Sequence, residues 1–308
     1  MFTLDFQYKG LSLSSRFPWK IGIVSFMAFP SMMRGEGDIP GFFKKLGSDP
    51  FFELLELCAL TEAQWSQAKP FLAGKILARG LQPELLTRKL DLNAKDSEER
   101  AKAIDYVKVE IDTAVKRGIS TIALCSGPDP GEGFREEAKE ILVKSLKEIC
   151  GYAASKGATI LLENFDREYD KRLLIGPTKE ALDVIKRVRL DYGNIALMWD
   201  LSHAPMLSED PKVLKGTGSL LGHIHIGCTK EDHGKLLDTH PVFHTPGAIN
   251  TEVELSSLLL QLWGMDYKGM ISFEVRPEEH QTSEGVIAQA KAVLMDAYRL
   301  MLLEILKG

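Results

Sequence analysis

Four polar side chains follow short apolar runs in this 308-residue sequence, at points where buried strands would end. Glu163 closes the run ATILLE, and Asp200 closes NIALMWD. His225 lies near the end of LGHIHIG, and Glu274 near the end of GMISFEV. A carboxylate that follows several apolar residues is costly to bury without a partner. One divalent metal (Mn, Mg, Co, Fe or Zn) would satisfy all four side chains, because carboxylates with an imidazole suit such ions.

Each of these residues also has a purely structural explanation. Glu163 could pair with an arginine of a neighbouring strand, and Asp200 could cap the turn that follows it. A lone histidine at a strand end could be a hydrogen-bonded core residue. The four together favour a site, because a satisfied core rarely needs such polarity at four strand ends on one rim.

More histidines lie close to this set, and all seven of the chain occur from residue 203 onward. Asp200 and His203 form a D-x-x-H unit in WDLSHA, where one could bind metal and the other substrate. His223 and His225 share one face of a strand, because strand side chains alternate with period two. His225 is nearer the strand end, so His223 is either structural or a support for His225.

Three other charged residues are weaker candidates. Arg276 shares a face with Glu274 by the same period, and it either reaches a substrate oxygen or neutralises Glu274. Glu56 and Arg79 lie near the ends of the second and third apolar runs. Either could line a pocket, but we expect both to form surface salt bridges.

Eight apolar runs are predicted to carry these residues as strands buried on both faces. They cover residues 20–29, 51–58, 74–81, 119–127, 158–165, 194–200, 221–227 and 269–275. Between them, segments such as 98–117 and 136–155 carry apolar residues at helical spacing and end at Gly118 and Gly157, as helices often do.

Strands that alternate with helices predict a parallel sheet, and eight such units close into a (β/α)8 TIM barrel, an α/β fold. Active sites of such barrels form at the carboxyl ends of the strands, where the polar residues lie. An open doubly wound sheet is the alternative, but no GxGxxG or P-loop pattern follows any strand.

Length and composition agree with one barrel domain over residues 1–308, in which residues 1–19 are an N-terminal extension. That extension could cross to a partner subunit or cover the barrel floor.

The net charge of −5 gives no excess of positive charge that would favour binding to nucleic acid or to an anionic membrane. Four cysteines without CxxC spacing and an N-terminus without a signal-peptide pattern predict a reduced, cytoplasmic protein.

The ordered series ILLEN, WDLSH, HIHIG, PGAIN and GMISFEVRP, within residues 20–300, resembles the xylose-isomerase-like TIM barrels. That family includes sugar and sugar-phosphate isomerases and epimerases. The resemblance implies that His203 contacts the substrate or a second metal. It also implies a small polyhydroxylated substrate and a homodimer or homotetramer. The residues implied to bind one metal are Glu163, Asp200, His225 and Glu274.

Endonuclease IV, a trinuclear zinc enzyme that cuts DNA at abasic sites, belongs to the same superfamily. Its first zinc needs histidines from early strands, and this sequence has none before His203. Another of its zincs uses the D-x-x-H histidine and a D-x-H after the seventh strand, which Asp238 and His240 match here. These residues either hold a second metal with His203, or line the substrate pocket and order the long loop 228–250.

We therefore expect a divalent-metal-dependent isomerase or epimerase that works through an enediolate. Glu163 and Glu274 are the expected pair for proton transfer. Substrate contacts are expected from His203, Arg276 and His240. The alternatives are a metal-dependent lyase or dehydratase, an endonuclease IV-like phosphodiester hydrolase, and a barrel that binds a sugar without turnover. A second metal would favour hydrolysis, whereas the absence of a basic patch argues against a DNA substrate.

Overall fold

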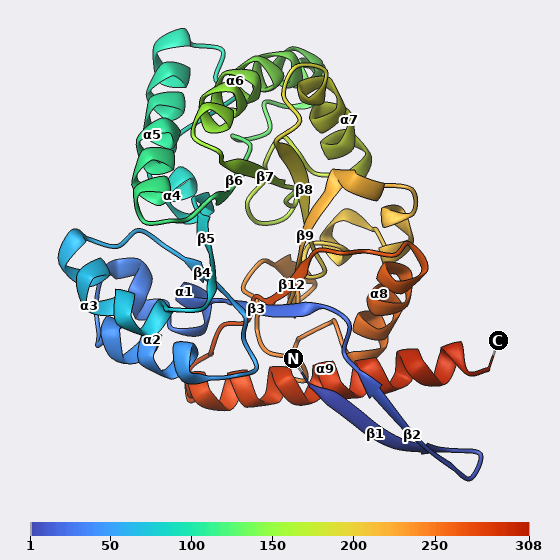
Figure 1. Ribbon diagram of the computed structural model, residues 1–308. Helices are drawn as coiled ribbons and strands as arrows, with labels where there is room; N and C mark the ends of the chain where they lie inside the picture. Colours follow the sequence, from blue (N-terminus) through green and yellow to red (C-terminus); the bar gives the residue numbers. More distant parts are fainter. Residues whose placement is uncertain (1, 308) are drawn as a thin grey trace.

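The computed structural model describes residues 2–307, and its centre is a closed barrel of eight parallel strands (Figure 1). The strands follow one another around the barrel in chain order, and β12 closes it against β3. The strands are β3 (Lys20–Val24), β4 (Leu54–Leu57), β5 (Ile76–Gly80), β6 (Thr121–Cys125), β7 (Thr159–Glu163), β8 (Ile195–Asp200), β9 (Leu221–Ile226) and β12 (Met270–Phe273). The predicted (β/α)8 fold is confirmed, and every predicted run contains a barrel strand.

The first predicted run is too long. Strand β3 ends at Val24, and the chain turns into the short helix α1 (Ser25–Ala28), all four residues of which are buried. A buried apolar run cannot be assigned to strand or helix by periodicity alone. The turn is held from a neighbouring strand, since the Ser25 hydroxyl donates to the backbone oxygen of Glu56 at 2.6 Å.

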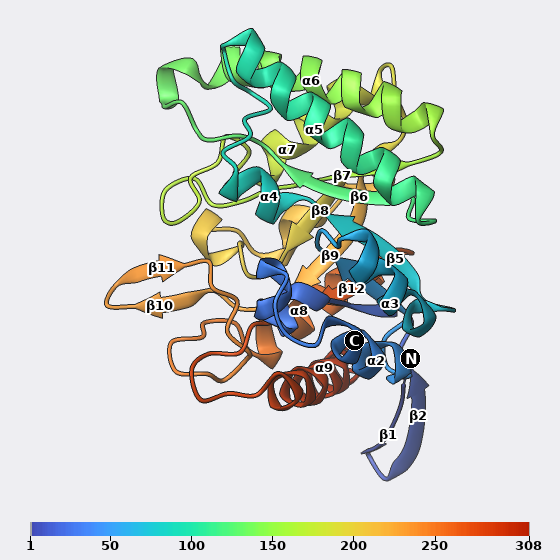
Figure 2. The ribbon, with the colours of Figure 1, turned by 90° about the vertical axis from the view of Figure 1, so that its left-hand side faces the viewer.

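Helices surround the barrel, as Figures 1 and 2 show. They are α2 (Ile39–Ser48), α3 (Glu62–Leu72), α4 (Gln82–Thr87), α5 (Ser97–Lys116), α6 (Arg135–Ser155), α7 (Thr178–Arg189), α8 (Glu252–Gly264) and α9 (Ser283–Ile305). Gly118 and Gly157 follow α5 and α6 with φ of +79° and +71°, which confirms the predicted helix ends. No helix within residues 2–307 combines the length and the hydropathy that crossing a bilayer requires.

The N-terminal extension is a β-hairpin of β1 (Thr3–Tyr8) and β2 (Leu11–Arg16), which projects from the barrel (Figures 1 and 2). Its base is anchored on α9. The Ser15 and Tyr298 hydroxyls lie 2.8 Å apart, and the rings of Phe17 and Tyr298 meet edge to face at 5.1 Å. A partner-subunit role for this extension stays a prediction.

The long loop 228–250 contains a second hairpin, β10 (Lys230–Asp232) with β11 (Lys235–Leu237). Its end is tied to the barrel mouth by Asn250, whose side-chain oxygen accepts from the Thr229 backbone N–H at 2.9 Å. The backbone N–H of Arg276 also donates to the His240 oxygen, at 2.7 Å. These bonds hold the loop segment that carries His240 against the segment that follows β12.

Candidate metal centre

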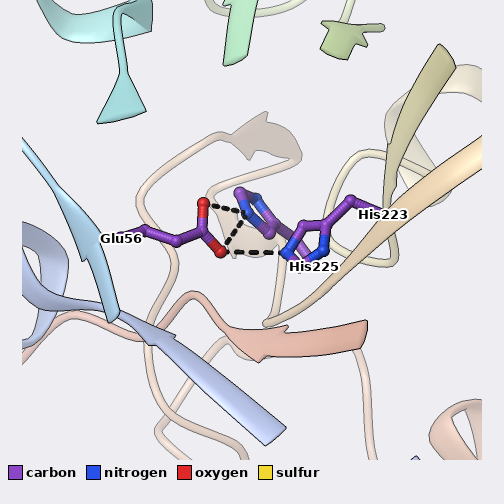
Figure 3. A group of neighbouring side chains, drawn as sticks. All are labelled: Glu56, His223 and His225. Atoms are coloured by element: carbon purple, nitrogen blue, oxygen red, sulfur yellow. Dashed lines mark hydrogen bonds and ion pairs between the residues drawn. The ribbon is translucent and has the colours of Figure 1, made fainter. Parts of the chain in front are cut away.

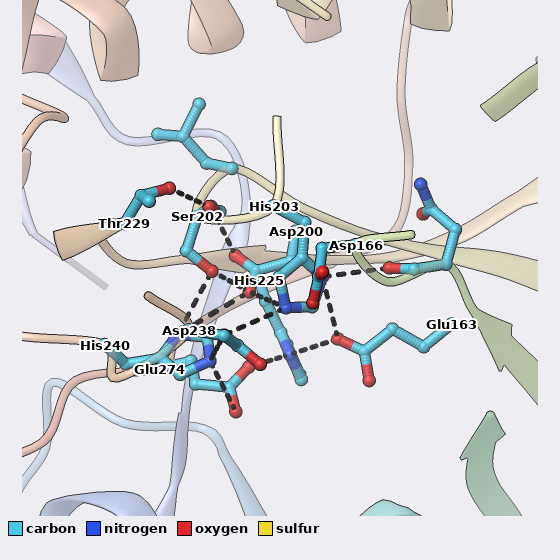
Figure 4. A network of polar contacts seen from close by, with 12 residues as sticks. Glu163, Asp166, Asp200, Ser202, His203, His225, Thr229, Asp238, His240 and Glu274 are labelled. Atoms are coloured by element: carbon cyan, nitrogen blue, oxygen red, sulfur yellow. Dashed lines mark hydrogen bonds and ion pairs between the residues drawn. The ribbon is translucent and has the colours of Figure 1, made fainter. Parts of the chain in front are cut away.

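The structure brings together the four residues predicted to bind metal. Each offers one ligand atom, and these atoms all lie within 4.8 Å of one another at the carboxyl ends of the strands (Figure 4). Barrel register explains the convergence, because Asp200 on β8 is paired with His225 on β9, which is paired with Ser272 on β12. Side chains alternate along each strand, so Glu274 lies on the same face as Ser272.

Two atoms of this group are buried without a hydrogen-bond partner among the described residues. They are Nδ1 of His225 and Oε2 of Glu274, which lie 2.6 Å apart. Oε1 of Glu163 lies 3.7 Å from the same Nδ1. Buried polar atoms are nearly always hydrogen-bonded or bound to an ion, so this convergence fits a cation bound by carboxylates and an imidazole.

Burial and mutual interaction shift the protonation of these groups. Burial raises the pKa of Glu163, and the negative charge of Glu274 adds to that effect. Burial also opposes ionisation of Glu274, but His240 and His225 outweigh it and lower its pKa. For His225, burial disfavours the charged ring, yet Glu56 and Glu274 raise its pKa well above the ordinary value. A proton therefore competes with a cation for the His225 ring, and cation binding would release protons.

Neighbouring polar groups orient two of the carboxylates. The amide of Gln82, the first residue of α4, donates to Oε2 of Glu163 at 2.7 Å, which leaves Oε1 towards the other ligands. The Ser202 N–H donates to Asp200 at 2.9 Å, and its hydroxyl donates to the other carboxylate oxygen. Sequence analysis did not single out Gln82, although it is a polar residue just past an apolar run, which is the signal that identified the other four.

A second group lies beside the first and contains the residues predicted for a second metal or for substrate contacts. Oδ1 of Asp238 is 3.2 Å from Nε2 of His203 and 2.7 Å from Nε2 of His240. Asp200 joins the two groups, because its Oδ2 lies 3.7 Å from both His203 Nε2 and His240 Nδ1. Asp200, His203 and His240 offer ligand atoms within 4.8 Å of one another.

In this second group, positively charged side chains already compensate the carboxylate of Asp238 without a cation. Burial works against charge at Asp238, but His240 and His203 hold its pKa well below the ordinary value. Burial likewise disfavours charge on His240, yet Glu274 and Asp238 raise its pKa to about 9. Lys171 adds a positive charge, with Nζ 3.2 Å from Oδ2 of Asp238. Lys171 was not predicted, since nothing separates it in sequence from the other charged residues of its loop.

A cavity of about 280 Å³ opens beside both groups. Its polar side is formed by site residues, among them Glu163, His225 and Glu274. Its apolar side is formed by Phe26, Met27, Met33, Leu86 and Phe165. Phe29, which follows Met27 closely in the chain, is not among the lining residues. Phe29 is instead buried against Phe42, with ring centroids 4.5 Å apart.

Arg276 lines the same cavity and is exposed. Within the described part of the chain, its guanidinium makes no ion pair with Glu274. Of the two roles considered for Arg276, neutralisation of Glu274 thus has no ion pair to support it, and contact with a substrate oxygen stays a prediction. Its backbone is fixed by the bond to the His240 oxygen, so the side chain extends from a rigid point at the cavity.

Glu56 and Arg79 are not surface residues, which corrects the prediction of surface salt bridges. Glu56 is 2% exposed on the inner face of the barrel, where it contacts His223 and His225. Burial opposes its ionisation, but these two imidazoles hold its pKa well below the ordinary value. Arg79 is 4% exposed on the outer face and pairs with Glu84 and Glu110 at 2.8 and 2.9 Å. Both residues lie on strands that were predicted to be buried on both faces, and the expectation of surface positions was inconsistent with that prediction.

Comparisons with known proteins agree with this geometry. The family model described as "Xylose isomerase-like TIM barrel" matches residues 51–295. No curated protein matches the sequence. Among solved structures, the IolI protein with a bound zinc atom is 18% identical, with a TM-score of 0.71 over 90% of this chain and 97% of that one.

Two further structures show the same fold at similar distance. D-psicose 3-epimerase, solved in the presence of D-fructose, is 17% identical, with a TM-score of 0.66 over 91% of this chain and 97% of its own. The AP endonuclease of family 2 from Brucella melitensis is 17% identical, with a TM-score of 0.67 over 89% of this chain and 98% of its own. At these sequence identities, the similarity to the three structures is a similarity of fold alone.

Proposed function

The chain belongs to the xylose isomerase-like TIM barrel family, and on that premise we propose that it is a divalent-metal-dependent isomerase or epimerase of a small polyhydroxylated carbonyl compound. The observation that carries the proposal is the convergence of four ligand atoms, all within 4.8 Å, from three buried residues and the half-buried Glu274, beside a small cavity. Two proteins of similar fold support it: the IolI structure contains zinc, and D-psicose 3-epimerase is named for sugar epimerisation.

The metal, when bound by Glu163, Asp200, His225 and Glu274, would polarise the substrate carbonyl and stabilise an enediolate. Glu163 and Glu274 would then move the proton, since they approach the site from β7 and from the segment after β12. One carboxylate removes the proton from the carbon beside the carbonyl, and a carboxylate returns it. Return to the opposite face of that carbon gives epimerisation, and return to the neighbouring carbon gives isomerisation.

The remaining polar residues of the site are assigned to substrate binding, although His203 is not among the residues that line the cavity. His203 has Nδ1 at 2.9 Å from the Asn164 oxygen, so the bond fixes its ring with Nε2 towards the site. His240 and Arg276 face the same cavity and would contact substrate oxygens. The volume of about 280 Å³ lies just below the usual range of ligand pockets, roughly 300–1,000 Å³, so the substrate should be small.

A second candidate function is hydrolysis or elimination with two metals, and the group of Asp200, His203 and His240 is the observation that favours it. Two adjacent metals would clamp the attacking and leaving oxygens of a phosphodiester. Against this, Lys171 and two imidazoles already compensate Asp238, so a second cation would have to displace positive charge. We therefore favour the one-metal proposal.

Proton exchange tests the proposal directly. The protein would be incubated with Mn²⁺ and a panel of ketoses and sugar-derived keto acids in D₂O, with an EDTA control, and deuterium incorporation read by NMR. Metal-dependent exchange at the carbon beside the carbonyl would support enolisation. No exchange across the panel, together with two metal equivalents by elemental analysis, would favour the hydrolase or lyase instead.

Replacing Glu163 or Glu274 by glutamine is expected to lower the exchange rate by about 10²-fold or more, because positioned proton transfer contributes roughly 10²–10⁴-fold. Glu279→Gln is the matched control, since that side chain is 90% exposed. Elemental analysis of each variant would separate loss of metal from loss of proton transfer. Full activity in either site variant would contradict the assignment.

A further inference from the structure

Glu56, His223 and His225 form a buried hydrogen-bonded group inside the barrel (Figure 3). Nε2 of His225 lies 3.1 Å from each carboxylate oxygen of Glu56, and Nε2 of His223 lies 2.9 Å from Oε1. The hydroxyl of Ser272 is a further neighbour of His223, at 3.0 Å. The group thus joins β4, β9 and β12 within the barrel.

The two ring nitrogens of His225 face different carboxylates. Nε2 faces Glu56, whereas Nδ1 faces Glu274 at 2.6 Å and Glu163 at 3.7 Å. Nε2 has the geometry of a hydrogen bond to Glu56, so it carries the proton and donates it, whereas Nδ1 makes no hydrogen bond among the described residues although Glu274 lies 2.6 Å away. In the neutral ring the other nitrogen then offers a lone pair, and here that nitrogen is the unpartnered Nδ1.

We infer that Glu56 is a positioning residue, which holds the N–H of His225 so that Nδ1 points at the bound cation, and that His223 orients the Glu56 carboxylate in turn. Metal-binding histidines commonly donate their second N–H to a carboxylate, which fixes the ring and makes it a better ligand. This inference rests on the proposed metal-dependent function, because it assigns a role towards that cation.

A different use of the same group would be a metal site of its own, since the three residues offer ligand atoms within 4.8 Å of one another. The contacts favour the positioning role. Glu56 already accepts from both imidazoles at ordinary hydrogen-bond distances. A cation there would bind Nε2 of His225, so that nitrogen could no longer donate to Glu56.

Metal affinity of Glu56→Gln tests the inference, measured with Zn²⁺ and Co²⁺ by competition with a chromophoric chelator. We expect a loss of about 10–100-fold with one equivalent still bound, as is typical when such a partner is removed. The Co²⁺ absorption spectrum should change, because the ring is no longer held. Ser272→Ala is the matched control: it removes a buried contact to His223 but leaves the Glu56–His225 contact, so its affinity should stay near that of the wild type.

The outcomes separate the two proposals. Metal binding by the wild type with unchanged affinity and spectrum in Glu56→Gln, even at a lower Tm, would overturn the positioning role alone. Loss of one of two metal equivalents would place a cation at Glu56 and also overturn it. A wild type that binds neither metal would overturn the proposed function itself.

Should Glu56→Gln fail to fold, the Zn²⁺-loaded wild type still decides the matter. Long-range ¹H–¹⁵N NMR of its histidines should show the proton of His225 on Nε2. A proton on Nδ1 would contradict the inference.

Discussion

Protonation of single side chains should compete with cation binding at the barrel mouth. The folded pKa of His240 is about 9, whereas an unfolded histidine titrates near 6.5. Because the folded pKa is raised, the stability that His240 contributes is fully present below pH 6.5 and is lost as pH rises towards 9. A cation needs unprotonated ligands, so the affinity of the site for a cation rises as pH rises.

The prediction is that the Tm of the metal-free protein falls between pH 6.5 and 9, and that the rise in Tm on adding Zn²⁺ grows over the same interval. His240→Asn should reduce the first effect, and differential scanning fluorimetry across this range would measure both. His233→Asn serves as the control, since that side chain is 96% exposed. An equal pH response in wild type and His240→Asn would count against the assigned shift.

At the scale of single elements, the alternation of side chains between the two faces of a strand positions the site. On β7 and β8 it places Leu161 two residues before Glu163, and Met198 two residues before Asp200. Leu161 and Met198 belong to a small apolar cluster apart from the main core, so they lie beneath the polar rim. Packing of this layer therefore supports the ligands above it.

Gly222 on β9 offers a test of that support. A Cβ added there would lie 2.7 Å from Cβ of Ala196 and from Cδ2 of Leu161. Overpacking of this kind usually costs about 1–3 kcal/mol, so Gly222→Ala should lower the free energy of unfolding by that amount and weaken metal binding as β9 shifts. Chemical denaturation would measure the first effect. Gly133→Ala is the control, because nothing lies within 4 Å of its added Cβ, and an equal cost in both variants would refute the packing argument.

At the scale of the whole molecule, the β1–β2 hairpin is the feature least explained by the barrel. Both strands are exposed or half-buried along their length, and an isolated two-stranded hairpin is marginal in water. We propose that the hairpin packs on a second copy of the chain.

Deleting residues 2–16 should then convert a dimer to a monomer while the metal site is kept, because the buried Phe17 and Trp19, which precede the first barrel strand, remain. Light scattering after size exclusion would measure the mass, and metal titration would verify the site. A deletion variant with the wild-type oligomeric state would reject the hairpin as the interface.

Much of this protein was determined by its sequence alone. Eight apolar runs with helices between them predicted the barrel, because parallel strands need crossovers and buried strands need apolar side chains. Polar residues at the ends of apolar runs identified the site residues, because a closed barrel brings the carboxyl ends of all strands to one rim. These residues are Glu163, Asp200, His225 and Glu274. The grouping of His203 with Asp238 and His240 came from the resemblance of their D-x-x-H and D-x-H motifs to endonuclease IV, and the structure brings these residues together.

Only the tertiary structure decided what each side chain contacts. Glu56 and Arg79 occupy similar places at the ends of neighbouring runs, yet one points into the barrel and the other onto its covered outer face. Inner and outer faces differ by one residue of register, which a strand buried on both sides does not reveal in its composition. Lys171 and Gln82 reach the site from segments whose paths depend on packing rather than on local pattern. The sequence thus determined which strands carry the site, and three-dimensional packing determined the partners of each ligand.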